Sequence, residues 1–211
     1  MTSPLNGRLV SLDAFRGFTI ASMLLVNNPG DWGHLYSQLA HAHWNGWTFT
    51  DWIFPFFLFI GGVSMSFSLG RQAEAGADKG ELLRKLFKRA ALIFLIGFLL
   101  NFIPKFDLAT VRIPGVLQRI ALCTALAAPL VVYFNWRQQL WWITGLLGFY
   151  SAVMLFVPVP GPDGVVAAGL LKPGRDAGAY IDRLFLSGHM WVQSKTWDPE
   201  GLFTTIPAIC S

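Results

Sequence analysis

The sequence predicts an all-α fold, a polytopic transmembrane helix bundle with five complete spans and the start of a sixth. Hydrophobic residues make up 54% of the 211-residue chain and charged residues only 13%, whereas a soluble domain carries about 25% charged residues. The chain therefore has too few charges to cover a surface that faces water. Its apolar residues also gather in runs close to the roughly 20 residues that a bilayer core requires.

The apolar runs are expected to be helices because backbone polar groups find no water partner in lipid. The five expected spans cover residues 10–29, 49–70, 87–104 (ending at Pro104), 113–134 and 139–158. A further apolar run begins at residue 201 and stops at residue 211, which is too short to cross a bilayer. We therefore expect a single transmembrane domain over residues 1–211 that is incomplete at its C-terminus.

Lysine and arginine residues between the spans predict the orientation. Six of them follow the second span (Arg71, Lys79, Arg84, Lys85, Lys88 and Arg89), and none lies between the first and second spans. By the positive-inside rule, the loop after the second span faces the cytoplasm. The N-terminus is then cytoplasmic as well, and the loops at 30–48 and 159–200 face outward. Because the basic residues cluster between apolar runs, the net charge of +4 does not indicate nucleic-acid binding.

Two predicted spans carry charges, and a charge inside a membrane needs a physical reason. Asp13 and Arg16 lie three residues apart near the cytoplasmic end of the first span. They are either a self-neutralising pair that anchors the helix end or an aspartate-oriented arginine that contacts phosphate. Arg119 follows Gln118 in the outer half of the fourth span. A snorkelling arginine is one explanation, but an arginine beside a glutamine favours a wet, functional interior.

The segment from His41 to Asp51 gathers polar side chains at the outer mouth of the second span. It also holds His43 and Asn45, and Asn27 ends the first span on the same side. A histidine there can act as a general base because its pKa lies near working pH, and an amide can donate to a developing oxyanion. Belt histidines and capping asparagines are equally the chemistry of an ordinary membrane boundary, so both interpretations stay open.

The sequence predicts neither a metal site nor a disulfide. His34, His41 and His43 lack a cysteine or glutamate partner at a known ligand spacing. The two cysteines, Cys123 and Cys210, both lie in apolar runs and are expected to be free thiols.

Several motifs together resemble the heparan-α-glucosaminide N-acetyltransferase family of membrane proteins, in a bacterial form. They are RLVSLDAFRG and VNN in the first span, HAHWNGWTFTDWIFPFFLFIGG across the second, RIPGVLQRI in the fourth, AYIDR in the outer loop, and DPEG before the sixth. They occur in the family's order and cover nearly the whole chain. The resemblance implies an integral protein of the bacterial inner (plasma) membrane, with the lipid bilayer as partner and a homodimer as an open alternative.

The resemblance also implies a reaction and its residues. Such enzymes take an acetyl group from cytosolic acetyl-CoA, a co-substrate, and deliver it to an amino sugar on the far side of the membrane. The family's active histidine, separated by two residues from its WNG motif, matches His41, and the family's asparagine after valine matches Asn27. The other expected contacts are with CoA (Arg16, Asp13 and Arg119) and with the acceptor (Asn45, Asp51 and His43).

Three points stay open at this level. His43 is a second candidate for the active histidine, and transfer is either direct or through an acetyl-histidine. The acceptor is either an amino sugar or another envelope glycan, because heparan sulfate is not an ordinary bacterial constituent. A transporter of a small polar solute is the alternative from another functional class, since Arg119 and broken helices suit a transport path. A lipid-embedded scaffold without a site leaves the outer polar segment unexplained.

Overall fold

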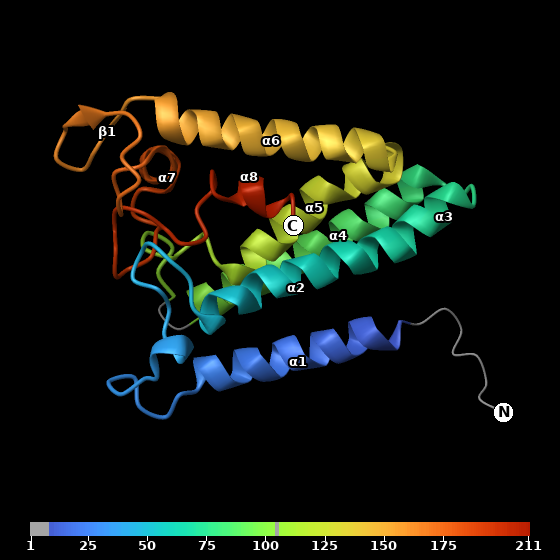
Figure 1. The fold of residues 1–211 in the computed structure, drawn as a ribbon, viewed down its shortest axis with the longest axis horizontal. Coiled ribbons are helices and arrows are strands. Elements are labelled where there is room, and N and C mark those ends of the chain that lie inside the picture. The colour runs from blue at the N-terminus through green and yellow to red at the C-terminus, as the bar shows by residue number, and fades with distance from the viewer. Residues whose placement is uncertain (1–8, 104–105) are drawn as a thin grey trace. The chain divides into compact units, whose positions relative to one another are not determined.

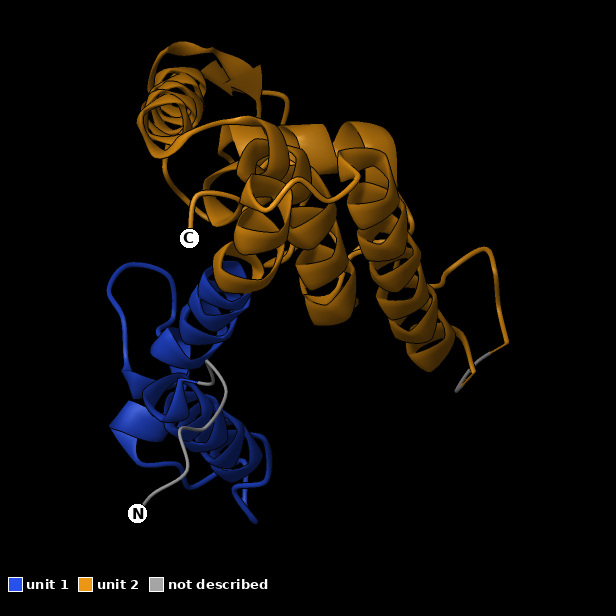
Figure 2. Cartoon of the chain, turned by 90° about the vertical axis from the view of Figure 1, so that its right-hand side faces the viewer, with its two compact units in different colours: residues 1–64 blue, residues 65–211 orange. Residues whose placement is uncertain are grey.

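The computed structural model describes residues 9–103 and 106–211, and the chain divides into two compact units, Met1–Ser64 and Met65–Ser211 (Figure 2). The expected end of a span at Pro104 lies outside the described residues. The described chain is mostly helical (Figure 1), which confirms the predicted all-α class.

The first unit contains two antiparallel helices, α1 (Val10–Asn27) and all but the last residue of α2 (Phe49–Met65), joined by a loop with a short 3-10 turn, η1 (Ser37–Leu39). Aromatic rings pair the helices: Phe18 lies 6.5 Å from Phe49, and Phe15 lies 5.1 Å from Phe56, between ring centroids. Because the pairs run in opposite senses along the two helices, the C-terminal end of α1 and the N-terminal end of α2 lie at the same end of this unit.

In the second unit, α4 (Lys79–Phe102) and α5 (Val116–Tyr133) pack side by side along their length (Figure 1). A core cluster lies at one end of this pair, with Leu82 of α4 against Ala128 and Val132 of α5. Met65 at the end of α2 and Leu69 of the π-helical turn η2 (Ser66–Gly70) complete this cluster, and α3 (Arg71–Glu74) follows η2.

At the other end of the pair the two helices approach closely. A Cβ added to Gly97 of α4 would lie 2.7 Å from Oε1 of Gln118, and one added to Gly115 would lie equally close to the same oxygen. The missing side chains therefore make room for the buried Gln118. The pair Leu82–Ala128 at one end and Gly97–Gln118 at the other shows that α4 and α5 are antiparallel.

Within the described residues, three helices are long and apolar enough to cross a membrane: Phe49–Glu74, which joins α2, η2 and α3, then Val116–Tyr133, and Trp136–Phe156. The last is α6, whose span carries no buried residue in the described chain. Helices also occupy the other two expected positions, as α1 and α4, but the predicted number of five spans and the start of a sixth is not confirmed. The structure thus supports an integral membrane protein with at least three candidate spans.

The segment between α6 and the C-terminus is compact rather than extended. It contains a two-stranded antiparallel hairpin, β1 (Val159–Pro160) with β2 (Val166–Ala167), and the helix α7 (Ala177–Leu186). The short helix α8 (Thr205–Ala208) lies near the end of the chain. Asp176 caps α7, because its Oδ1 accepts the Ala179 amide at 2.8 Å.

Candidate active site

The first turn of α2 supplies the carboxylate around which the loop between α1 and α2 is organised. Asp51 lies three residues after Thr48, the spacing of a capping box, and its Oδ2 accepts the Thr48 amide at 2.9 Å. The same oxygen accepts the Ala42 amide at 3.1 Å and lies 3.0 Å from the Thr48 hydroxyl. A carboxylate in the first helical turn is also favoured by the helix dipole. Asp51 therefore holds the chain on both sides of the WNG motif.

The other oxygen of Asp51 binds His41. Nδ1 of His41 lies 2.6 Å from Asp51 Oδ1. Because an ionised carboxylate only accepts hydrogen bonds, this contact places the histidine proton on Nδ1 and leaves Nε2 of the neutral ring as the basic nitrogen. The His41 side chain is 75% exposed, whereas the Asp51 side chain is 27% exposed. The arrangement therefore gives an accessible base with an oriented ring.

The other residues predicted to belong to this site are near the pair in sequence or at the end of α1, but they form no hydrogen bond with it in the described chain. His43, Asn45 and Asn27 are all exposed. Asn27 ends α1 nine residues beyond Phe18, whose ring packs on Phe49, so it lies about 13 Å further along the axis at 1.5 Å per residue. That is the side of the first unit on which the 28–48 loop lies. Among the described residues, no hydrogen bond joins Asn27 to His41.

The charges near the start of α1 form a small polar network. Nη1 of Arg16 lies 3.2 Å from Asp13 Oδ1, and Nη2 donates to the Ser64 hydroxyl at 2.9 Å. Both side chains remain partly exposed, at 42% for Arg16 and 30% for Asp13. The predicted self-neutralising pair is therefore present, and the serine of α2 ties it to the neighbouring helix.

A second polar cluster, not foreseen from the sequence, lies in the second unit. Arg112 donates through Nε and Nη2 to the two oxygens of Asp198, at 2.9 and 2.6 Å, and also pairs with Glu200. The Asp198 side chain is completely buried and accepts the Trp191 amide as well. Burial raises the pKa of Glu200, Arg112 opposes that effect, and the neighbouring Asp198 charge adds to it. Glu200 is thus a carboxylate with little solvent and one strong cationic partner.

Two further side chains fix the DPEG turn that carries these carboxylates. Arg119, predicted to face a functional interior, donates to the backbone oxygens of Pro199 at 2.8 Å and of Thr204. Asp182 of the AYIDR motif accepts the Leu202 amide at 2.9 Å, and burial, with a smaller contribution from the charge of Asp198, raises its pKa to about 6. These contacts hold the turn against α5 and α7.

Spacing in the sequence could not reveal the second cluster, because Arg112 lies 86 residues from Asp198. Composition offered one signal. Charges are rare in this chain, and the RIPG, AYIDR and DPEG motifs each contribute one or more to the same side of the predicted bundle. Side chains of opposite charge on one side of a membrane protein are expected to form ion pairs, because an unpaired buried charge is costly.

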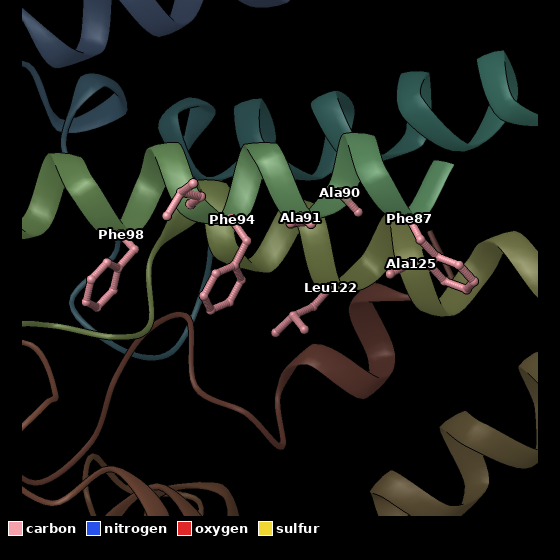
Figure 3. Close-up of a pocket in the computed structure, with 9 residues that line it drawn as sticks. Phe87, Ala90, Ala91, Phe94, Phe98, Leu122 and Ala125 are labelled. Atoms are coloured by element: carbon pink, nitrogen blue, oxygen red, sulfur yellow. The ribbon is translucent and has the colours of Figure 1, made fainter. Parts of the chain in front are cut away.

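A pocket between α4 and α5 is chemically different from both clusters. Its volume is about 640 Å³, and it is lined by the rings of Phe87, Phe94 and Phe98 and by alanine and leucine side chains. Figure 3 shows the three rings projecting from α4 on one side. The pocket offers almost entirely apolar contact. Within residues 9–103 and 106–211, no group of three or more His, Cys, Asp or Glu side chains is arranged to hold a metal ion.

Comparison with known proteins agrees with this assembly of motifs. The family model for the catalytic region of heparan-alpha-glucosaminide N-acetyltransferase matches residues 8–191. The chain is 32% identical over 252 aligned positions to the heparan-alpha-glucosaminide N-acetyltransferase of Homo sapiens, covering 98% of the chain and 37% of that protein. The Mus musculus protein of the same name is 32% identical over 247 positions, covering 96% of the chain and 37% of that protein. The chain thus spans little more than a third of the length of these relatives. It belongs to the heparan-alpha-glucosaminide N-acetyltransferase family.

Proposed function

We propose that the protein transfers an acetyl group from cytosolic acetyl-CoA to the amino group of a glucosamine-type sugar, or of another envelope glycan, on the opposite side of the membrane. The observation that carries this proposal is the His41–Asp51 pair, an exposed imidazole whose Nδ1 lies 2.6 Å from a carboxylate oxygen. It stands in the HAHWNG segment, which resembles the motif that carries the family's active histidine. Both relatives are named for N-acetylation of a glucosaminide.

In the proposed reaction the acceptor nitrogen attacks the carbonyl carbon of the acetyl thioester. Nε2 of His41 takes the proton that the nitrogen loses as the carbon–nitrogen bond forms. The carbon–sulfur bond then breaks, and the protonated His41 returns the proton to the departing CoA thiolate, so the enzyme is regenerated. Asp51 keeps the ring in the correct tautomer and stabilises the imidazolium that forms in between.

Asn27 is proposed to stabilise the oxyanion. The nitrogen of its side-chain amide would donate to the thioester oxygen as negative charge develops there, which typically contributes about 3 kcal/mol to lowering the barrier. Arg16, held by Asp13 and Ser64, is proposed to meet the CoA phosphates at the cytoplasmic side. Arg119 is proposed as a second contact for CoA, in addition to its bonds with the DPEG turn. Asn45 and His43 are proposed to contact the acceptor.

Acetyl transfer by the full-length protein in lipid vesicles tests the proposal, with glucosamine and a hydroxyl-only sugar as acceptors. His41→Ala should lower turnover by about 10²–10⁴-fold, the usual contribution of a general base. His34→Ala is the matched control, because His34 is an exposed histidine of the same loop that pairs with Asp31 rather than with Asp51. His43→Ala, which changes a proposed acceptor contact, tests the alternative histidine. Full activity of His41→Ala, or a loss confined to His43→Ala, would refute the assignment. Acetylation of the hydroxyl-only sugar alone would refute an amine acceptor.

A further inference from the structure

The outer side of α7 has the opposite polarity from that of a helix on a water-exposed surface. Both charged residues of the helix turn toward the protein: Asp182 is 1% exposed and bonds to the Leu202 amide, and Arg183 donates to the backbone oxygens of Pro160, Gly174 and Thr196. The side chains left exposed are apolar, with Leu184 at 60% and Phe185 at 72%. A surface helix normally shows the reverse pattern, with its apolar stripe inward.

The apolar residues of α7 form a single face. Ile181, Leu184 and Phe185 follow the three- and four-residue spacing that places side chains on one side of a helix. Ile181 is half-buried and the other two project outward. We call these three residues the outer face of α7. No charged side chain of α7 lies on it, because both are engaged on the opposite side.

The surroundings of the outer face indicate what covers it. α7 contacts α6, whose span carries no buried residue in the described chain. Phe156 and Val157, where α6 ends, are exposed as well. In Figure 1, α6 runs across the picture whereas α7 is seen nearly along its axis, so the two helices cross steeply. If α6 spans the bilayer, α7 lies close to the membrane plane, at the level where α6 leaves the hydrocarbon.

We propose that α7 is an interfacial helix whose outer face, Ile181, Leu184 and Phe185, inserts into the lipid at the non-cytoplasmic boundary. An interfacial helix ordinarily turns its charged face to water. Here the protein itself satisfies the polar face through Asp182 and Arg183, so the apolar face can only gain by leaving water. Because Asp182 also bonds to the DPEG turn, lipid contact would fix the height of that turn against the membrane. The inference is independent of acetyl transfer.

Site-specific fluorescence in the full chain tests the proposal. Cys123 and Cys210 are first replaced by alanine, and a bimane label is attached at Phe185→Cys and, separately, at Leu184→Cys. Gln193→Cys is the matched control, because Gln193 is a polar, exposed residue of the same segment. Each labelled protein is reconstituted into phosphatidylcholine vesicles with or without a lipid that carries a nitroxide near its headgroup, and iodide serves as the quencher in water.

The expected result is a blue-shifted emission at positions 184 and 185 that loses intensity with the nitroxide lipid and resists iodide. The label at position 193 should respond in the opposite way. Equal iodide quenching at 185 and 193 would overturn the proposal, because the face would then be in water. A blue-shifted label that neither quencher reaches would overturn it as well, because a protein surface would then cover the face. Position 184 gives the answer if the variant at 185 does not fold.

Discussion

Replacing Asp51 by asparagine should invert the active-site tautomer while leaving the loop in place. The asparagine oxygen can keep the bonds from the Thr48 and Ala42 amides, which now reach Asp51 Oδ2 at 2.9 and 3.1 Å. Its NH₂ group then faces His41 Nδ1, which lies 2.6 Å from the second carboxylate oxygen. Because an NH₂ group donates, Nδ1 must become the acceptor, and the proton moves to Nε2. The nitrogen proposed as the base is then already protonated.

The expected loss follows from that change of tautomer. A general base of this kind contributes on the order of 10²–10⁴-fold, or about 3–5 kcal/mol in the barrier. Asp51→Asn should therefore lower acetyl transfer in vesicles by a factor in that range. The double variant with His41→Ala should be no worse than His41→Ala alone, because residues that act as a unit do not contribute additively.

The same loop offers a matched control. His34 Nδ1 lies 2.5 Å from Asp31 Oδ2, an exposed pair of the same chemistry. Asp31→Asn removes a similar contact without touching the proposed base, so activity should remain close to that of the wild type. The reasoning is refuted if Asp51→Asn keeps more than about a tenth of the wild-type turnover, well above the range given for a general base. It is also refuted if the losses of Asp51→Asn and His41→Ala multiply in the double variant.

Three further predictions concern stability. Gly97→Ala places a methyl 2.7 Å from a buried amide oxygen of α5, which should cost about 1–3 kcal/mol and lower the apparent melting temperature in detergent. Gly145→Ala should not, because a Cβ added there meets no atom within 4 Å. Burial raises the pKa of Asp182 from 3.8 to about 6. Between these two pH values this carboxyl binds more protons in the folded protein than in the unfolded chain. The free energy of unfolding therefore falls by at most about 3 kcal/mol as the pH rises from 4 to 6. The wild-type melting temperature should thus rise relative to that of Asp182→Asn between pH 7 and 5, and parallel profiles would contradict the assignment. Arg112→Met leaves a buried carboxylate without its cationic partner, which should lower the free energy of unfolding by about 3–5 kcal/mol and speed hydrogen exchange in the DPEG turn. Lys85→Met removes one partner of an exposed ion pair and should leave that exchange unchanged.

Hydrophobic runs located the long helices well, but helix ends depended on chemistry that hydropathy does not measure. The expected run at 87–104 begins at Lys79 in the structure, because Asp78 caps the helix through the Gly80 amide and lysine and arginine are good helix formers. The run expected at 139–158 begins at Trp136, because Asn135 and Gln138 form a capping box. Both helices thus begin before the apolar runs that hydropathy predicts, and polar residues form their first turns.

The candidate site was foreseen in part. The polar segment from His41 to Asp51 was expected to gather a site, and the structure does bring His41 and Asp51 into contact. That Asp51 orients His41 depends on how the intervening loop turns back, which residue spacing does not determine. The expectation that Asp51 contacts the acceptor stays a prediction, as does the role of Asn27. The outer segment was expected to be a loop, and α7 was missed because its apolar residues face outward and its carboxylate faces inward.

The sidedness of the reaction tests the central claim most directly. The full-length protein is reconstituted in sealed vesicles of uniform orientation, with labelled acetyl-CoA on the side of the 71–89 loop and glucosamine only on the side of the His41 loop. The account predicts labelled N-acetylglucosamine in the glucosamine compartment, and none with His41→Ala. Product that forms only when both substrates share one compartment would contradict transfer across the membrane by the His41–Asp51 pair.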